Sequence, residues 1–124
     1  LQVCTFLRAA RQADNDELAQ RHEALVKAHG FTGTVTGYPG WPGDRGNPLA
    51  AVLDGVWRQQ TGHSLEIGAV HVGLEPSVFQ AKAPGLVMAS TGPDILDAHS
   101  VDERAPLDGL PDYALLLAGA MEAL

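Results

Sequence analysis

Glycine and proline crowd residues 38–47, and this segment divides the chain. It contains the consecutive triplets Tyr38-Pro39-Gly40 and Trp41-Pro42-Gly43. Such a composition interrupts helices and strands and is typical of a linker or crossover. We therefore expect a domain boundary here, with one piece over residues 1–37 and a second over residues 48–124. The two aromatic side chains are expected to anchor the crossover on a neighbouring surface.

Strand-like and helix-like segments alternate on both sides of this crossover. Runs rich in β-forming residues predict strands at 1–7, 31–38, 65–71 and 86–90. Apolar residues at helical spacing predict helices at 14–29, 48–61, 77–82 and from 111 to the end. The start and stop signals are the capping-box spacing of Asp14 and Glu17, Gly30, Asn47 before Pro48, and Gly62. The last helix is expected to bury one apolar side: Tyr113, Leu116, Leu117, Ala120, Met121 and Leu124. The alternation predicts an α/β fold: a βαβ unit first, then part of a layered α/β domain. Neither piece has enough strands to close a core, so we expect a fragment of a larger fold.

Charge and cysteine content exclude several classes of protein. The net charge is −7 and the basic residues are scattered singly, which excludes nucleic acid and membrane surfaces as partners because both are bound by clustered lysine and arginine. The longest apolar run is too short to span a bilayer. The single cysteine, Cys4, excludes an internal disulfide and fits a reducing, cytoplasmic compartment.

His99 lies in a loop rich in carboxylates that follows the predicted strand 86–90. The surrounding acids are Asp94, Asp97, Asp102 and Glu103. Imidazole is the commonest metal-binding side chain, and a neighbouring carboxylate raises its basicity, so His99 is either a metal ligand or a solvated loop histidine. A catalytic metal needs three or more protein ligands. Any metal partners of His99 would therefore lie on sequence outside this chain.

Three other residues are candidates for binding a substrate. Gly73 follows the predicted strand 65–71 and would let a ligand approach the backbone closely. Glu75 is either an acceptor for an ammonium group, or a support for a metal-bound histidine, or a plain surface acid. Arg8 ends the first predicted strand and either offers its planar fork to a substrate carboxylate or pairs with a surface acid. His71 alternates with apolar strand residues and is interpreted as a core histidine.

Several short stretches, in this order and spacing, resemble the C-terminal part of family M20 metallopeptidases, and most closely the aminoacyl-histidine dipeptidases (Xaa-His dipeptidases). They are Gly37-Tyr38-Pro39-Gly40-Trp41 with Asn47-Pro48-Leu49, then Val70-His71-Val72-Gly73-Leu74-Glu75, then Gly92-Pro93 with Ala98-His99-Ser100-Val101-Asp102-Glu103. The resemblance covers nearly the whole chain.

The resemblance implies a catalytic domain that holds two zinc ions and a ferredoxin-like lid domain inserted into it. Residues 1–37 would be the last part of the lid. His99 would match a metal ligand, Gly73 a glycine lining the substrate site, and Arg8 a lid arginine that contacts substrate. The other ligands and the glutamate general base would lie in an N-terminal remainder, so this chain alone is expected to be inactive. The implied partners are a small peptide substrate, that remainder and a second copy in a homodimer.

The chain departs from the family pattern at three places. Val101 stands where proline is usual, Asp97 stands where glycine is usual, and Pro76-Ser77 replaces Cys-Gly. These changes leave the histidine in place but bear on the substrate. Two alternatives to a dipeptidase therefore stay open: an acylase, desuccinylase or carboxypeptidase with the same metal site, and a non-catalytic binding or dimerisation module.

Overall fold

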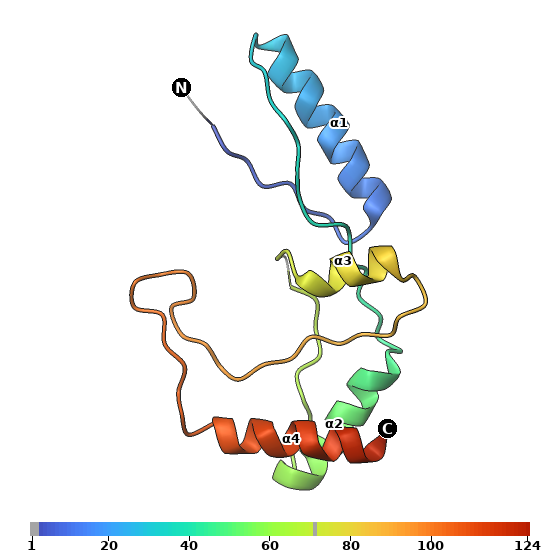
Figure 1. Ribbon diagram of the computed structural model, residues 1–124, viewed down its shortest axis with the longest axis vertical. Coiled ribbons are helices and arrows are strands. Elements are labelled where there is room, and N and C mark those ends of the chain that lie inside the picture. The colour runs from blue at the N-terminus through green and yellow to red at the C-terminus, as the bar shows by residue number, and fades with distance from the viewer. Residues whose placement is uncertain (1–2, 71) are drawn as a thin grey trace. The chain divides into compact units, whose positions relative to one another are not determined.

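The computed structural model describes residues 3–70 and 72–124. The helices of this described part are, in chain order, α1 (Gln12–Ala28), α2 (Pro48–Thr61), α3 (Glu75–Lys82) and α4 (Leu110–Ala123) (Figure 1). All four predicted helices are confirmed, with α3 beginning two residues earlier than expected. None of these helices combines the length and the apolar character that a membrane crossing requires.

The chain forms two compact units, and each of them draws on two stretches of sequence. Unit 1 consists of Leu1–Arg45 and Gly68–Leu86, and unit 2 of Gly46–Ile67 and Val87–Leu124. Each unit is described by itself below. The lid, crossover and catalytic pieces expected from the sequence stay a prediction.

The predicted α/β fold is wrong for the described residues. A βαβ piece of a ferredoxin-like lid followed by part of an α/β catalytic domain would require a sheet, but no described residue belongs to one. The strand pairing found there is a single antiparallel bridge between Leu96 and Arg104, and the described parts of the four predicted strands run as coil (Figure 1). Alternating β-formers predict which residues share a face. A strand also needs a neighbour with which to exchange backbone hydrogen bonds, and the pattern does not supply that neighbour.

In unit 1, α1 begins one turn earlier than its predicted capping box. The N-cap is Arg11, with no side-chain cap, and its guanidinium instead binds Asp14 through two contacts of 2.7 and 2.8 Å. This hydrogen bond and the carboxylate charge raise the pKa of Arg11. The predicted stop at Gly30 is confirmed, because Gly30 has a φ of +75° and donates its N–H to the Lys27 carbonyl.

In unit 2, the predicted start of α2 is confirmed in atomic detail. The Asn47 side chain accepts the N–H groups of Leu49 (2.9 Å) and Ala50 (3.4 Å), and Pro48 occupies the first helical position. The Asn47 amide also donates to the Met88 carbonyl at 2.6 Å. The helix ends at Gly62 in the left-handed conformation. The Asn47 side chain therefore joins the start of α2 to the segment around Met88, which follows α3 in the sequence.

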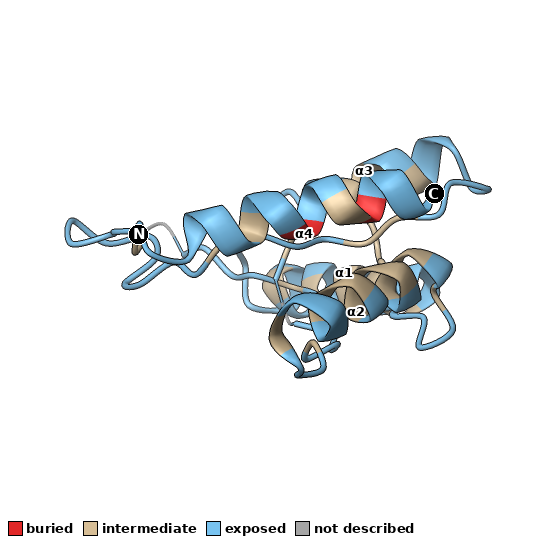
Figure 2. Cartoon of the chain, turned by 90° about the horizontal axis from the view of Figure 1, so that it is seen from below, coloured by how far each residue is buried: buried red, intermediate tan, exposed pale blue. Residues whose placement is uncertain are grey.

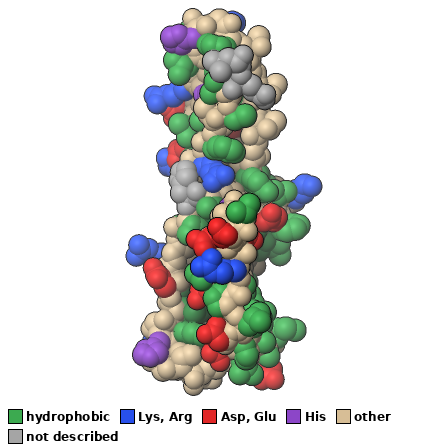
Figure 3. All heavy atoms as spheres, turned by 90° about the vertical axis from the view of Figure 1, so that its left-hand side faces the viewer, with side chains coloured by type: hydrophobic (Ala, Val, Ile, Leu, Met, Phe, Trp, Pro, Cys, Tyr) green, Lys and Arg blue, Asp and Glu red, His purple; other side chains and the backbone are tan. Residues whose placement is uncertain are grey.

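The hydrophobic core of the described residues is small and lies on α4. Leu116 is 2% exposed and Ala120 is 8% exposed, and α4 packs against α2. Figure 2 marks these positions on a chain that is otherwise mostly exposed. Leu117, Met121 and Leu124 were also predicted to be buried but are exposed, because α2 covers only one narrow side of α4. Hydrophobic side chains consequently reach the surface on the face drawn in Figure 3.

Candidate functional site

A short closed loop in unit 2 presents His99. Leu96 and Arg104 close it by exchanging backbone hydrogen bonds of 2.9 and 3.1 Å. Inside the loop, the Ser100 N–H donates to the Asp97 carbonyl at 3.1 Å. The loop therefore satisfies several of its own backbone groups without help from a sheet.

Two residues of this loop adopt the left-handed backbone conformation. Asp97 has a φ of +52° and His99 a φ of +64°. Such values are uncommon outside glycine, although Asp and His reach them more often than most residues. Asp97 stands at the position where the resembled family usually has glycine, and the positive φ gives that preference a physical reason. The conformation turns the chain tightly on both sides of Ala98.

Two carboxylates hold the loop in this conformation. The Glu103 side chain accepts the backbone N–H of His99 at 2.6 Å. Arg104 forms an ion pair with Asp97 and donates to the Asp102 carbonyl at 3.2 Å. Glu103 and Asp97 thus bind the backbone and an arginine of the loop, and not the imidazole. His99 is exposed, and within the described residues we find no hydrogen bond to its ring.

The described residues alone do not provide a complete metal site. No group of three or more His, Cys, Asp or Glu side chains among them is placed to hold an ion. Of the four acids near His99, Asp97 and Glu103 are already engaged with Arg104 and with the backbone. What this loop offers to a metal is therefore one exposed imidazole on a hydrogen-bonded support.

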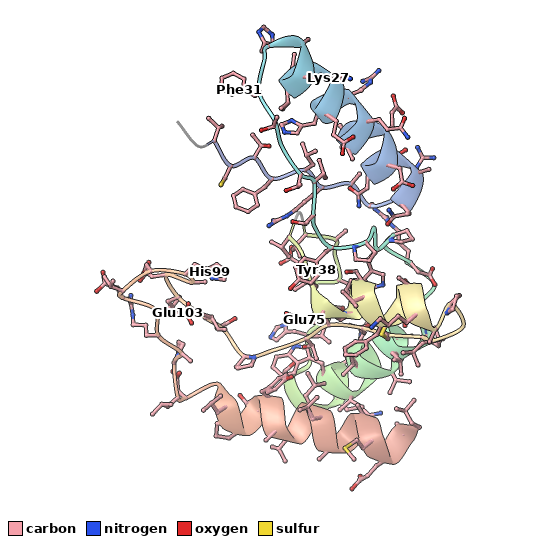
Figure 4. All side chains as sticks on the ribbon, turned by 45° about the horizontal axis from the view of Figure 1, so that its top comes forward. Lys27, Phe31, Tyr38, Glu75, His99 and Glu103 are labelled. Atoms are coloured by element: carbon pink, nitrogen blue, oxygen red, sulfur yellow. The ribbon has the colours of Figure 1, made fainter. Side chains whose placement is uncertain are left out.

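The predicted substrate residues Gly73 and Glu75 lie in unit 1 and both contact Tyr38. A Cβ atom placed on Gly73 would come within 2.7 Å of the Tyr38 ring, well inside the 3.5–4.0 Å of an ordinary carbon contact. The Tyr38 hydroxyl donates to the Glu75 carboxylate at a long 3.5 Å. Figure 4 shows Tyr38 and Glu75 close to each other. This contact agrees with the expectation that Tyr38 anchors the crossover.

Arg8 belongs to the same unit, and its guanidinium lies over the Phe6 ring, 5.7 Å from the centroid. This is within the range of a cation–π contact. His99 belongs to the other unit. The structure therefore brings Gly73 and Glu75 together and gives Arg8 a local partner. His71, interpreted as a core histidine, falls outside the described residues.

Sequence reasoning missed the functional interest of Tyr38 and the supporting role of Arg104. The signal for Tyr38 was its position in the triplet Tyr38-Pro39-Gly40, which predicted an anchor without naming its target. For Arg104, the signal was an arginine that follows a run of acids. Neither pattern specifies a partner, because both partners depend on turns that the sequence does not fix.

Two open hollows on the surface are lined by other residues than those predicted for the site. One, of about 410 Å³, lies in unit 1 between α1 and the segment after it, and Lys27 and Phe31, labelled in Figure 4, line it. The other lies in unit 2 along α2 and the end of α4. Their linings include neither the predicted metal ligand nor the predicted substrate residues.

Comparison with known proteins finds a distant relative along the whole chain. The chain is 25% identical over 125 aligned residues to the cytosol non-specific dipeptidase of Escherichia coli (strain K12). The alignment covers all of this chain and 26% of the relative, so the chain spans about a quarter of that protein's length. No protein-family model matches the chain. The finding is a distant similarity to a dipeptidase, whose name places it in the cytosol.

Proposed function

We propose that this chain is part of a metal-dependent hydrolase that cleaves dipeptides, including those of the Xaa-His type. The observation that carries the proposal is the similarity to a dipeptidase, which runs along the entire chain. The M20 motifs that surround Gly73 and His99 support it. A cytoplasmic location and a homodimer belong to the same proposal.

His99 is proposed as the single metal ligand that this chain supplies. Its ring is exposed on a loop whose backbone is fixed by the Leu96–Arg104 bridge and by Glu103. Zinc is the proposed metal, with two ions in the complete site, and a bound zinc ion lowers the pKa of its water and polarises a carbonyl. The remaining ligands would come from a part of the protein outside these residues.

Arg8, Gly73 and Glu75 are proposed to contact the dipeptide. Arg8 would bind its carboxylate, because a guanidinium matches a carboxylate with two parallel hydrogen bonds. Glu75 is exposed and carries only acceptor oxygens when ionised, which suits the ammonium end of a peptide. Gly73 would offer backbone groups between these two ends.

Exposed hydrophobic side chains support a place in a larger fold. Phe6 is 82% exposed, Val70 is 69% exposed and Met121 is 78% exposed. Apolar side chains that are this exposed would gain stability if another protein surface covered them. We propose that an N-terminal remainder of the enzyme covers a share of these residues.

The test is His99→Ala in the complete protein that contains this chain. With Ala-His and Ala-Ala as substrates, we expect turnover to fall by about 100-fold or more, because one metal ligand is lost. Bound zinc, measured by atomic absorption, should fall from two ions per chain to about one. Retention of both zinc and turnover would contradict the proposal.

His63→Ala is the matched control. His63 also lies in unit 2 and is exposed, and it follows the end of α2 away from the loop that carries His99. We expect its variant to keep zinc and turnover. A complete wild-type protein that hydrolyses neither substrate would overturn the dipeptidase assignment itself.

A further inference from the structure

We propose that Tyr38 is a positioning residue of the substrate site, which fixes the turn from Gly73 to Glu75. The inference rests on the proposed function, because that turn is the part of unit 1 proposed to contact the dipeptide. It adds a residue to which neither the motifs nor the comparison assigned a role in the site. Three contacts within unit 1 carry it.

The first contact is between the Tyr38 ring and the backbone of Gly73. A Cβ atom on Gly73 would lie 2.7, 3.1 and 3.2 Å from three carbons of the ring. An aromatic ring cannot flex away as the end of a long side chain can, so a side chain at this position must push the ring or the turn aside. The Tyr38 ring therefore occupies the space that a side chain at position 73 would need.

The second contact is between the Tyr38 hydroxyl and Glu75. The hydroxyl donates to Oε1 at 3.5 Å, a distance at which a hydrogen bond is weak. Glu75 is in the first turn of α3, and Tyr38 is 48% exposed. The ring therefore supplies most of the constraint, and the hydroxyl adds a weak hold on the Glu75 carboxylate.

The third contact ties the crossover to the start of α1. Gly40 donates its N–H to the Gln12 side chain at 2.9 Å. A Cβ atom on Gly40 would come within 2.6 to 2.7 Å of backbone atoms of Ala10, Arg11 and Gln12. Tyr38 is two residues away, so its own backbone is held by this close approach. A fixed backbone gives the ring a fixed place against Gly73.

The experiment measures kcat and KM for Ala-His on the complete protein with three variants. Gly73→Ala and Tyr38→Ala are each expected to raise KM by about tenfold, because a misplaced turn loses binding contacts. Tyr38→Phe keeps the ring and loses only the long hydrogen bond to Glu75, so it should raise KM by about threefold or less. kcat and zinc content should change little, since neither substitution touches the contacts that hold the loop of His99.

The double variant Gly73→Ala/Tyr38→Ala separates positioning from a general loss of structure. Once the ring is gone, the added methyl has room, so Gly73→Ala should lower the stability of the protein in the wild-type background but not in the Tyr38→Ala background. Tyr113→Phe is the matched control, because the Tyr113 hydroxyl donates to the Thr91 carbonyl in unit 2 at 3.2 Å, and its KM should stay unchanged.

The outcomes distinguish a failure of the Tyr38 positioning role from a failure of the dipeptidase proposal. Unchanged KM in Tyr38→Ala, or an equal loss of stability from Gly73→Ala with and without the Tyr38 ring, would overturn the positioning role while leaving the dipeptidase proposal intact. A wild-type protein that hydrolyses no dipeptide would overturn the dipeptidase proposal and this inference with it.

Discussion

Asp97 occupies a backbone conformation that usually belongs to glycine, and an ion pair with Arg104 accompanies it. The left-handed conformation costs a residue with a side chain about 1–2 kcal/mol. An exposed ion pair stabilises the folded loop by about 0.2–1 kcal/mol. The ion pair therefore offsets part of the backbone cost, and aspartate at this position is less stable without Arg104.

The prediction compares the stability of the loop in two variants at this position. Asp97→Gly loses the ion pair but also removes the backbone cost, so the loop should stay about as stable as in the wild type. Asp97→Ala loses the ion pair and keeps the cost, so the loop should open more often. The measurement is hydrogen exchange at the Leu96 and Arg104 amides, which close the loop. Faster exchange in the glycine variant than in the alanine variant would contradict the account.

The sequence predicted which residues gather around His99 but not what they bind. Four acids near one histidine suggested carboxylates on the imidazole, and the structure engages two of them elsewhere: Asp97 with Arg104, and Glu103 with the His99 N–H. These partners follow from the left-handed backbone of Asp97 and of His99, the residues on either side of Ala98. Spacing along a sequence carries no signal for such turns when glycine is absent.

At the scale of elements, all four helices were predicted correctly, whereas the described parts of the four predicted strands are coil. The helices carry their own signals, such as the Asn47 cap before Pro48 and the left-handed Gly62 after Thr61, and their hydrogen bonds are internal. A strand takes its hydrogen bonds from another segment, which no local pattern identifies. The capping box at Asp14 failed for a related reason, because Arg11 engages that carboxylate.

A matched pair of glycines tests how α2 and α4 pack in unit 2. Gly55 in α2 has nothing within 4 Å of where a Cβ would lie, whereas a Cβ on Gly119 in α4 would meet Val56 at 2.7 Å. Gly55→Ala should raise the free energy of unfolding by about 0.5–1 kcal/mol through helix propensity. Gly119→Ala should not raise the free energy of unfolding, because overpacking against Val56 costs about 1–3 kcal/mol and cancels the gain from helix propensity.

Val56→Ala provides the control, and urea unfolding provides the measurement. In the Val56→Ala background, the added methyl on Gly119 has room, so Gly119→Ala should become stabilising by a similar ~0.5–1 kcal/mol. Equal effects of Gly119→Ala with and without Val56 would show that the helices do not meet at this point.

For the whole molecule, the balance between apolar content and burial is the dominant feature. Hydrophobic residues make up 45% of the chain, a normal share for a globular protein. Among the described residues, however, the buried hydrophobic side chains are Leu116 and Ala120. Burial of apolar surface is the main favourable contribution to folding, so these residues alone gain little from it. Most of the ordered structure therefore consists of helices, which are stabilised by their local hydrogen bonds and caps.

The last prediction follows from that balance and uses the 124-residue chain itself. Because the urea m-value grows with the surface exposed on unfolding, we expect it at or below the lower end of the usual ~1–3 kcal/mol/M for small proteins. The chain should bind the dye ANS, which reports exposed apolar surface, while circular dichroism shows helix with little strand. The complete protein should bind less ANS per chain, since we propose that its remainder covers residues such as Phe6 and Met121. A chain that binds no ANS and unfolds with an m-value near 3 kcal/mol/M would mean that these side chains are already buried.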